Sequence, residues 1–323
     1  MAVRDIDIAD RTRFGASRAI AASRVSVATH PMQVQSRRSW SGALFVLPYL
    51  VVYVVFCIYP LVNAIAFSTY RADLFGGGEF IGLQNFVRLF QDPIFLRSLW
   101  NTIYFILLTV PPLVVIGLLL ALVLQKPTRT SSILRAVFFS SSVLSVAIVA
   151  LLWRVILMPD DGLVAKILGA FGHAPIAFVD RADLALPALA ISTIWWCLGL
   201  PMMLFLAALK QVPREIYDAA ALDGAGRLRT LWSITLPSIR RTFSVVVIIE
   251  VVMQFQMFGQ AQLLTQGGPN NASKSLVLFI YDASFKGWDV GYATAASQVL
   301  FGFMLMITLG QYLLLNRRRE KRP

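Results

Sequence analysis

The sequence predicts an all-α integral membrane protein with six transmembrane helices and both termini in the cytoplasm, and three observations lead to this fold class. Charged residues make up 14% of the 323 residues and hydrophobic residues 57%, whereas a soluble domain carries roughly 25% charged residues. Six apolar runs are long enough to cross a bilayer, and the positive charges gather in alternate loops. The formal net charge of +12 is therefore interpreted as membrane topology rather than as a nucleic-acid-binding surface.

The six apolar runs each reach the length of about 20 residues that a membrane-spanning helix needs. They cover residues 43–67, 98–125, 133–157, 184–209, 239–264 and 291–315. Prolines interrupt several of them, and we expect kinks at these points, because neighbouring segments can satisfy the carbonyls that a proline frees.

The distribution of lysine and arginine predicts the orientation. The segments 1–42, 126–135, 210–241 and the C-terminal tail carry 21 of the 29 positive residues, and the three remaining loops carry seven. Because cytoplasmic loops hold the excess of positive charge, both termini and the segment 210–241 are expected in the cytoplasm. We therefore expect a disordered tail at 1–42, a transmembrane domain at 43–315 with a cytoplasmic loop at 210–238, and a basic tail at 316–323.

Motifs for bond chemistry are missing from the sequence. It contains no phosphate-binding loop of the G-x-x-x-x-G-K-[ST] type, no H-E-x-x-H and no C-x-x-C pattern. Cys57 and Cys197 lie inside apolar runs, where cysteine is expected to behave as a small hydrophobic residue. We therefore expect no catalytic residue, no metal site and no cofactor bound by this chain, and a membrane enzyme is disfavoured.

The cytoplasmic segment 215–237 reads EIYDAAALDGAGRLRTLWSITLP and differs from the apolar sequence around it. Pro213 suits the first turn of a helix, the alanines at 219–221 favour the helix, and Gly224 favours its end. The segment is interpreted as two short helices joined by an elbow of small residues, which lets another surface approach the backbone closely. An amphipathic loop lying on the membrane is the alternative from the residues alone.

The pattern Asp218-Ala219-Ala220-x-x-x-Gly224, followed by Ile234-x-Leu236-Pro237, resembles the EAA loop of membrane subunits of binding-protein-dependent ABC importers. The carbohydrate-uptake branch, of the maltose and glycerol-phosphate type, is the most similar. Further resemblances lie at 80–86, 92–93, 101–102, 264–269 and 291–295, so that the likeness covers roughly residues 43–315. Where relatives often carry a proline, this chain has Phe138–Ser141, and we expect a less kinked third span.

The resemblance implies a type I ABC importer permease in a bacterial inner membrane, with six spans. Its partners would be a second homologous permease, two ATP-binding subunits that hold ATP and magnesium, an extracytoplasmic solute-binding protein, a sugar or glycoside, and membrane lipid. The coupling contact with the ATPase is expected from Glu215, Asp218, Ala219, Ala220, Asp223, Gly224 and Ala225. Asp218 stands where the family has glutamate, and the sequence leaves open whether Asp218 or Glu215 makes the main contact.

Polar residues in the fifth span suggest a path for the solute. Amides and aromatic faces suit sugars and are costly against lipid, so we expect the path to be lined by Gln254, Gln256, Met257, Phe258 and Gln260. Contacts that only hold helices together are the alternative.

The sixth span contributes Thr294, Ser297 and Phe301 as further candidates for the path, and Glu250 is an intramembrane charge of open role. A self-contained secondary transporter or channel is the competing function. That class favours inverted repeats or titratable residues in several spans, and only Glu250 is clearly so placed.

Overall fold

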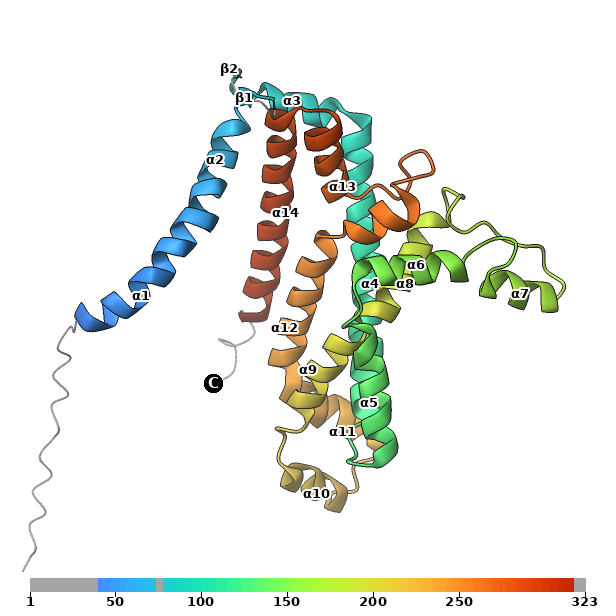
Figure 1. Ribbon diagram of the computed structural model, residues 1–323. Coiled ribbons are helices and arrows are strands. Elements are labelled where there is room, and N and C mark those ends of the chain that lie inside the picture. Colours follow the sequence, from blue (N-terminus) through green and yellow to red (C-terminus); the bar gives the residue numbers. More distant parts are fainter. Residues whose placement is uncertain (1–39, 74–77, 317–323) are drawn as a thin grey trace, which may run out of the picture. The chain divides into compact units, whose positions relative to one another are not determined.

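The computed structural model describes residues 40–73 and 78–316 and is mostly helical. In chain order its elements, with η marking π-helical segments, are α1 (Trp40–Tyr53), η1 (Val54–Ile58), α2 (Tyr59–Phe67), β1 (Tyr70–Arg71), β2 (Glu79–Phe80), α3 (Gln84–Gln91), α4 (Pro93–Val123), α5 (Arg129–Ser141), α6 (Val146–Ile156), α7 (Leu163–Ala170), α8 (Ala185–Cys197), α9 (Gly199–Leu209), α10 (Arg214–Leu222), α11 (Arg227–Thr230), η2 (Leu231–Thr235), α12 (Leu236–Phe255), η3 (Ala261–Thr265), α13 (Leu276–Tyr281), η4 (Asp282–Lys286) and α14 (Val290–Asn316) (Figure 1). The expected disorder of the tail 1–42 and the expected basic tail 316–323 fall almost wholly outside the described residues.

Three continuous helical stretches are long and apolar enough to cross a membrane: Leu44–Phe67, Pro93–Val123 and Val290–Leu313. They correspond to the first, second and sixth predicted spans. The pairs α5–α6 and α8–α9 also qualify if each is one broken span, with bends of 97° and 44°. The structure thus contains three to five apolar spans within its described residues.

The fifth predicted span, 239–264, is not one continuous helix. α12 ends at Phe255, and the chain then runs through a short non-helical segment before η3. α12 also carries the charged residues Arg240, Arg241 and Glu250, and its mean hydropathy is lower than that of α4 and α14. The apolar run predicted as the fifth span is therefore divided between α12 and the helical segment that ends with η3.

The expectation of a less kinked third span is wrong, because α5 and α6 meet at 97°. Serine hydroxyls end α5 without a proline: Ser140 Oγ donates to Val137 O at 2.8 Å and Ser141 Oγ donates to Phe138 O at 2.9 Å. Ser145 then caps the start of α6 by accepting from Ile148 N at 3.4 Å. Such local hydrogen bonds satisfy the carbonyls and amides that a broken helix leaves without partners.

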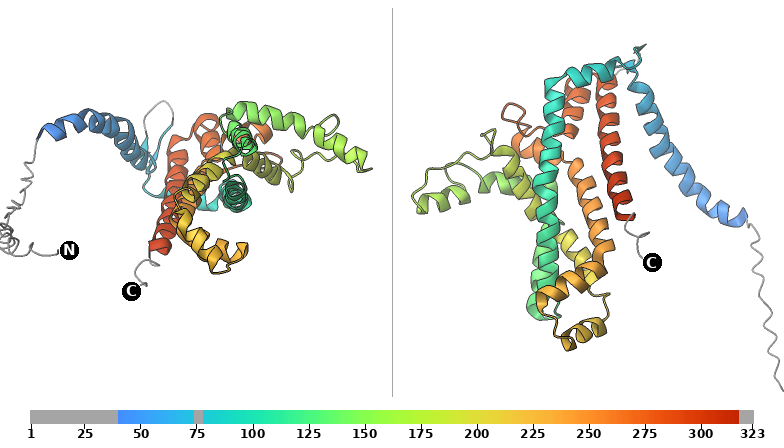
Figure 2. Two further views of the ribbon diagram at one scale, coloured as in Figure 1. Left: turned by 90° about the horizontal axis from the view of Figure 1, so that it is seen from below. Right: turned by 180° about the vertical axis from the view of Figure 1, so that it is seen from behind.

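α4 forms the centre of the bundle and packs along α8, α9 and α12. The largest buried cluster joins α4, α9 and α12 through residues such as Val114, Phe205 and Val246. Figures 1 and 2 show α3 and the start of α4 at one end of this bundle, with α10 and α11 at the other end. The apolar bundle therefore lies between two polar ends, one formed by α3 and the start of α4 and the other by α10 and α11.

The end formed by α3, α13 and the starts of α4 and α14 is fastened by polar contacts. Asp92 caps α4 by accepting from Ile94 N at 2.7 Å, and its other oxygen accepts from the Tyr292 hydroxyl of α14 at 2.7 Å. The Arg88 guanidinium lies 4.1 Å from the centre of the Tyr292 ring and pairs with Asp289. These contacts tie α3, α4 and α14 together where the three begin or end.

We predict that Gly199→Ala destabilises the protein. An added Cβ would lie 2.6 Å from Ser142 Oγ and 2.8 Å from Phe139 Cα, so α5 and α9 would have to separate. Overpacking of this kind costs about 1–3 kcal/mol of unfolding free energy. The thermal-unfolding midpoint of the purified protein measures the effect. Gly302→Ala on α14 is the control, since its Cβ would meet nothing within 4 Å; equal midpoints for the two variants would contradict the close contact.

Candidate functional site

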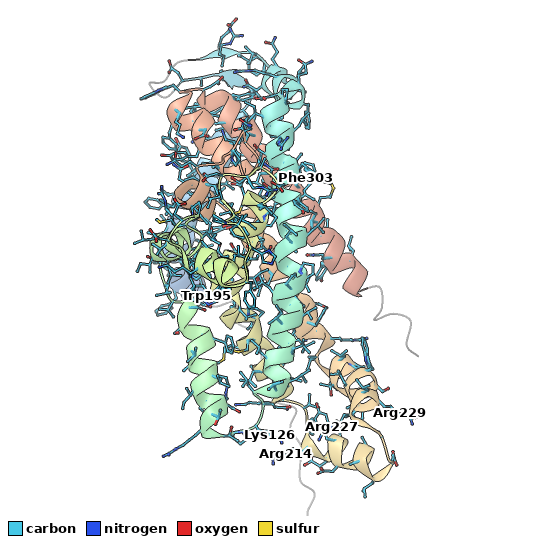
Figure 3. The ribbon with its side chains drawn as sticks, turned by 90° about the vertical axis from the view of Figure 1, so that its right-hand side faces the viewer. Lys126, Trp195, Arg214, Arg227, Arg229 and Phe303 are labelled. Atoms are coloured by element: carbon cyan, nitrogen blue, oxygen red, sulfur yellow. The ribbon has the colours of Figure 1, made fainter. Side chains whose placement is uncertain are left out.

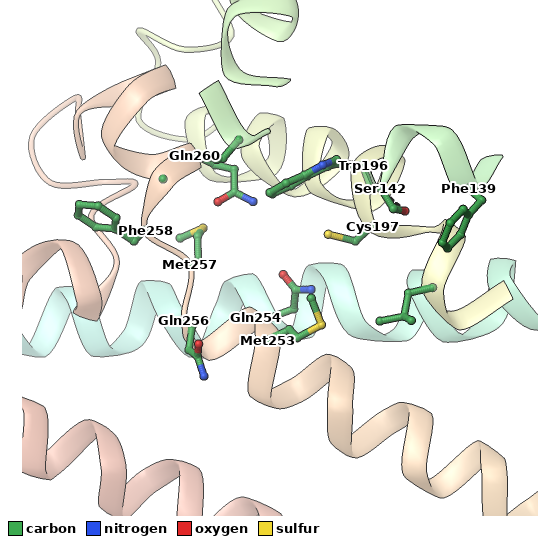
Figure 4. A pocket seen from close by; sticks show the side chains of 13 residues that line it. Phe139, Ser142, Trp196, Cys197, Met253, Gln254, Gln256, Met257, Phe258 and Gln260 are labelled. Atoms are coloured by element: carbon green, nitrogen blue, oxygen red, sulfur yellow. Dashed lines mark hydrogen bonds between the residues drawn. The ribbon is translucent and has the colours of Figure 1, made fainter. Parts of the chain in front are cut away.

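A cavity of about 590 Å³ lies where three interrupted helical segments meet. The interruptions are the α5–α6 bend, the α8–α9 bend and the end of α12 with the segment 256–260 that follows it. The cavity is lined by Phe139, Ser142, Val146, Trp196, Cys197, Leu200, Met253, Gln254, Gln256, Met257, Phe258, Gly259 and Gln260. Figure 4 shows Trp196, Cys197 and Ser142 on one side and Met253 and Gln254 on the other.

The wall formed by the 256–260 segment is held from behind. Met257 O accepts from Ser275 Oγ at 2.6 Å, and the same hydroxyl caps α13 by accepting from Leu278 N at 3.1 Å. The Phe258 ring packs against Tyr281 of α13, with 5.1 Å between ring centres. The segment 256–260 therefore has a defined course, and the helix break within it places its glutamine amides on the cavity wall.

The opposite wall is joined across the two helix bends. Ser142 Oγ donates to Trp196 O at 3.0 Å, and Trp196 Nε1 donates to Leu144 O at 3.0 Å. Both bonds satisfy backbone carbonyls close to a bend, where the helical hydrogen-bond pattern is interrupted. They fix the Trp196 indole at the edge of the cavity.

The lining combines hydrogen-bonding groups with aromatic faces. Three glutamine amides and the Ser142 hydroxyl can donate and accept, and Phe139, Trp196 and Phe258 supply rings. No lysine, arginine, aspartate or glutamate lines the cavity in the part of the chain that the structure describes. This chemistry suits a polar, ring-shaped solute with many hydroxyl groups.

The structure brings the predicted residues of the fifth span together. Gln254, Gln256, Met257, Phe258 and Gln260 all line the cavity. Glu250, one helical turn before Gln254, does not line it; its side chain is buried, with 1% exposed, and Oε2 accepts from Gln254 Nε2 at 3.3 Å. Their role as a solute path stays a prediction.

The candidates on α14 lie elsewhere. The Thr294 hydroxyl donates to Val290 O at 2.9 Å and the Ser297 hydroxyl to Ala293 O at 3.0 Å, so both are satisfied within their own helix. Phe301 is 49% exposed on the helix surface. None of the three lines the cavity, and their contact with a solute stays a prediction.

Sequence reasoning missed the cavity residues contributed by α5, α8 and α9. They include Phe139, Ser142, Trp196, Cys197 and Leu200. The available signals were the serines at 140–142 and the Gly199-x-Pro201 pattern, both of which interrupt an apolar run in its middle. Read as helix breaks, they would have placed these residues next to each other.

The loop after η3 is fastened to α4. Asn101 Nδ2 donates to Asn271 O at 2.8 Å and to Lys274 O at 3.0 Å, and Thr102 Oγ1 accepts from Leu276 N at 2.9 Å. Lys274 and Lys286 both pair with Asp282, at 2.8 and 2.7 Å. Burial raises the pKa of Asp282, but the hydrogen bonds from the two lysines outweigh it, and the pKa lies below its ordinary value. The loop that resembles the family motif is thus well ordered.

The loop at the other end of the bundle contains the predicted elbow, which is the turn at residues 223–226 between α10 and α11 together with α10 itself. α10 begins after Pro213, ends at Leu222, and is followed by Gly224 with φ +71°, a conformation that favours glycine. The amides of Gly224 and Ala225 donate to Ala221 O and Ala220 O, at 3.1 and 2.9 Å, which closes the end of the helix. α11, η2 and α12 then continue the chain into the bundle.

The elbow presents an open surface. Glu215, Asp218, Ala219 and Asp223 are exposed, and Leu222 is 90% exposed. A hollow of about 300 Å³ beside them is lined by Ile216, Ala219, Ala220, Asp223, Ala225, Arg229, Ser233 and Ile234. Figure 3 shows Lys126, Arg214, Arg227 and Arg229 at this same end of the molecule.

Comparisons with known proteins agree with these features. The profile of the family described as "Binding-protein-dependent transport system inner membrane component" matches residues 90–321. The chain is 31% identical over 283 residues to the probable ABC transporter permease protein YurN of Bacillus subtilis, covering 86% of this chain and 97% of that one. It is 31% identical over 278 residues to the sn-glycerol-3-phosphate transport system permease protein UgpA of Salmonella choleraesuis, covering 85% of this chain and 94% of that one.

A solved structure shares the fold. The chain matches one from a bacterial alginate ABC transporter in complex with an alginate pentasaccharide-bound periplasmic protein, with a TM-score of 0.76 and 25% identity, covering 88% of this chain and 96% of that one. The chain therefore belongs to the family of binding-protein-dependent inner membrane transport components. It is a membrane permease subunit of an ABC importer.

We predict that Trp196→Ala raises the KM for solute uptake more than Trp195→Ala does. Trp196 lines the cavity, whereas the neighbouring Trp195 is 40% exposed and packs its ring on Trp153 at 6.1 Å. Loss of an aromatic stacking face is worth about 1.4 kcal/mol, or roughly a tenfold rise in KM for uptake. Uptake into vesicles at matched expression measures KM. Equal KM values for the two variants would show that the Trp196 ring does not contact the solute.

Proposed function

We propose that this chain spans the membrane six times and forms part of the path by which an ATP-driven importer carries a sugar or glycoside into the cytoplasm. The observation that carries the proposal is the cavity, whose amides, hydroxyl and aromatic faces suit a saccharide. The named cargo of similar permeases, glycerol phosphate and alginate, supports a polyhydroxylated solute.

The proposed orientation places the α10–α11 end in the cytoplasm. The excess of lysine and arginine in the segments at this end, 126–135 and 210–241, supports it. α12 would be the additional span, completing six with the three continuous and two bent spans. The outer loop 266–275 and the end where α3 meets α14 would then face the solute-binding protein, whose counterpart is present in the alginate transporter structure.

The elbow is proposed as the contact with a separate ATPase that holds ATP and magnesium. Two such subunits would serve this chain and a second, homologous permease. Small side chains at Ala219 and Ala225 let a partner approach the backbone, and the carboxylates of Glu215 and Asp218 offer partners for its arginines. Both carboxylates are exposed and lie three residues apart on α10, so either can make the main contact.

The mechanism follows from the way the elbow is connected to the cavity. α11, η2 and α12 form a continuous helical path from the elbow to Phe255, immediately before the segment 256–260 that lines the cavity. Movement of the elbow on ATP binding would therefore displace one wall of the cavity. The permease would convert docking energy into a shift between outward- and inward-facing populations without bond chemistry of its own.

We predict that the chain co-purifies with a separate ATPase and a second permease, and that a saccharide-loaded binding protein stimulates ATP hydrolysis by the assembly. The binding protein is first screened by thermal shift against a panel of sugars and glycosides to find its ligand. A chain that purifies alone and moves solute without ATP would instead be a self-contained transporter.

We predict that Ala219→Arg abolishes stimulated ATP hydrolysis, because its side chain would fill the hollow at the elbow. Ala221→Arg is the matched control: Ala221 is also exposed on α10 but does not line the hollow. Membrane insertion is checked by fractionation and the ATPase contact by co-purification. Undiminished stimulation in Ala219→Arg would rule out docking at this hollow.

A further inference from the structure

Glu250 is a carboxyl group buried inside the bundle next to the cavity. Its side chain is 1% exposed, and no lysine or arginine pairs with it among residues 44–73 and 78–313, whose side chains the structure describes. Its hydrogen-bond partner is the amide of Gln254, whose Nε2 donates to Oε2 at 3.3 Å. A buried carboxyl group of this kind is costly, and a structural role alone would be served by an apolar residue of similar size.

The bond to Glu250 determines how Gln254 meets the cavity. A glutamine amide has a donating NH2 end and an accepting carbonyl end. Because the NH2 end of Gln254 is directed to Glu250, its carbonyl oxygen is left for the cavity that Gln254 lines. A carbonyl acceptor binds the hydroxyl donor of a sugar and offers nothing to a carboxylate or phosphate.

The charge distribution favours the same class of solute. The thirteen residues that line the cavity include no cation, so an anionic solute would lose its hydration without gaining an opposite charge. Glu250, one helical turn behind Gln254, places a carboxyl group beside the site. This differs from what the cargo of similar permeases requires, because glycerol phosphate and the acidic polysaccharide alginate are both anions.

We propose that Glu250 determines the specificity of the cavity: it orients the Gln254 amide and makes the cavity select uncharged saccharides over anionic ones. This inference rests on the proposed function as a saccharide importer. Glu250 acts through Gln254 and is a positioning residue, whereas Gln254 touches the solute.

The test uses the assembled importer in lipid nanodiscs without the binding protein, so that the permease alone sets the selectivity. Tryptophan fluorescence, which includes Trp196 at the cavity edge, is titrated with maltose, raffinose and sucrose as neutral probes and with digalacturonic acid and sn-glycerol 3-phosphate as anionic probes. The variants are Glu250→Gln, Glu250→Leu, Gln254→Leu and the double variant Glu250→Leu/Gln254→Leu.

We expect wild-type protein to bind at least one neutral probe and neither anionic probe. Glu250→Gln keeps an acceptor for the Gln254 amide but removes the carboxyl group, so neutral binding stays within about threefold while an anionic probe gains affinity. Glu250→Leu removes the acceptor, and neutral binding weakens about tenfold, the size of one lost hydrogen bond in a buried site. The double variant is no weaker than Gln254→Leu, because both changes remove the same interaction.

Thr109→Val is the control for a buried polar group of the same bundle, since the Thr109 hydroxyl donates to Phe105 O within α4 and does not line the cavity. It should change neither the affinity nor the order of the probes. A wild-type protein that binds an anionic probe more tightly than every neutral one overturns the inference, as do Glu250 variants whose probe order and affinities match wild type. If no saccharide-loaded binding protein stimulates ATP hydrolysis by the wild-type assembly, the proposed function itself fails.

Discussion

The structure depends on one constraint: backbone groups freed by a helix break inside an apolar bundle need partners within the protein. Breaks occur after Ser141, after Cys197 and after Phe255, and side-chain hydrogen bonds from other segments of the chain close them. At the first two breaks, Ser142 Oγ donates to Trp196 O and Trp196 Nε1 donates to Leu144 O. At the third break, Ser275 Oγ donates to Met257 O. Because lipid offers no such partners, the freed backbone groups are satisfied within the protein, and a cavity lined by amides and aromatic faces forms where the breaks meet.

The same constraint explains what could be predicted from the sequence. The elbow follows local rules, and Pro213 and Gly224 mark its first helix as expected, since helix ends are decided by residues close in the chain. The bend at α5–α6 was not predicted. Serines can bond carbonyls of their own helix without ending it, and Ser140 and Ser141 do bond such carbonyls. The bend also uses a carbonyl of α8 more than fifty residues away in sequence, as in the Ser142–Trp196 bond, and that partner is not visible in the local sequence. Length and apolar composition alone therefore did not distinguish the bent pairs α5–α6 and α8–α9 from continuous spans.

The cavity shows a similar division. Glutamines in an apolar run are a strong local signal of a polar environment, and Gln254, Gln256 and Gln260 do share the cavity. Thr294 and Ser297 gave a weaker signal, because hydroxyls can be satisfied by their own helix, as both are here. A glutamine amide cannot bond its own backbone in this way as readily, and it must find a partner elsewhere or face water. A glutamine in an apolar run therefore predicts a polar site better than a serine or threonine does.

The central claim is that the meeting point of the three breaks is the solute path. A structure of the assembled importer, determined with its binding protein and saccharide and with ATP hydrolysis blocked, tests this claim most directly. The account predicts saccharide density between Trp196 and the Gln256–Gln260 segment. Density against Thr294 and Ser297 of α14, with the cavity empty, would contradict it.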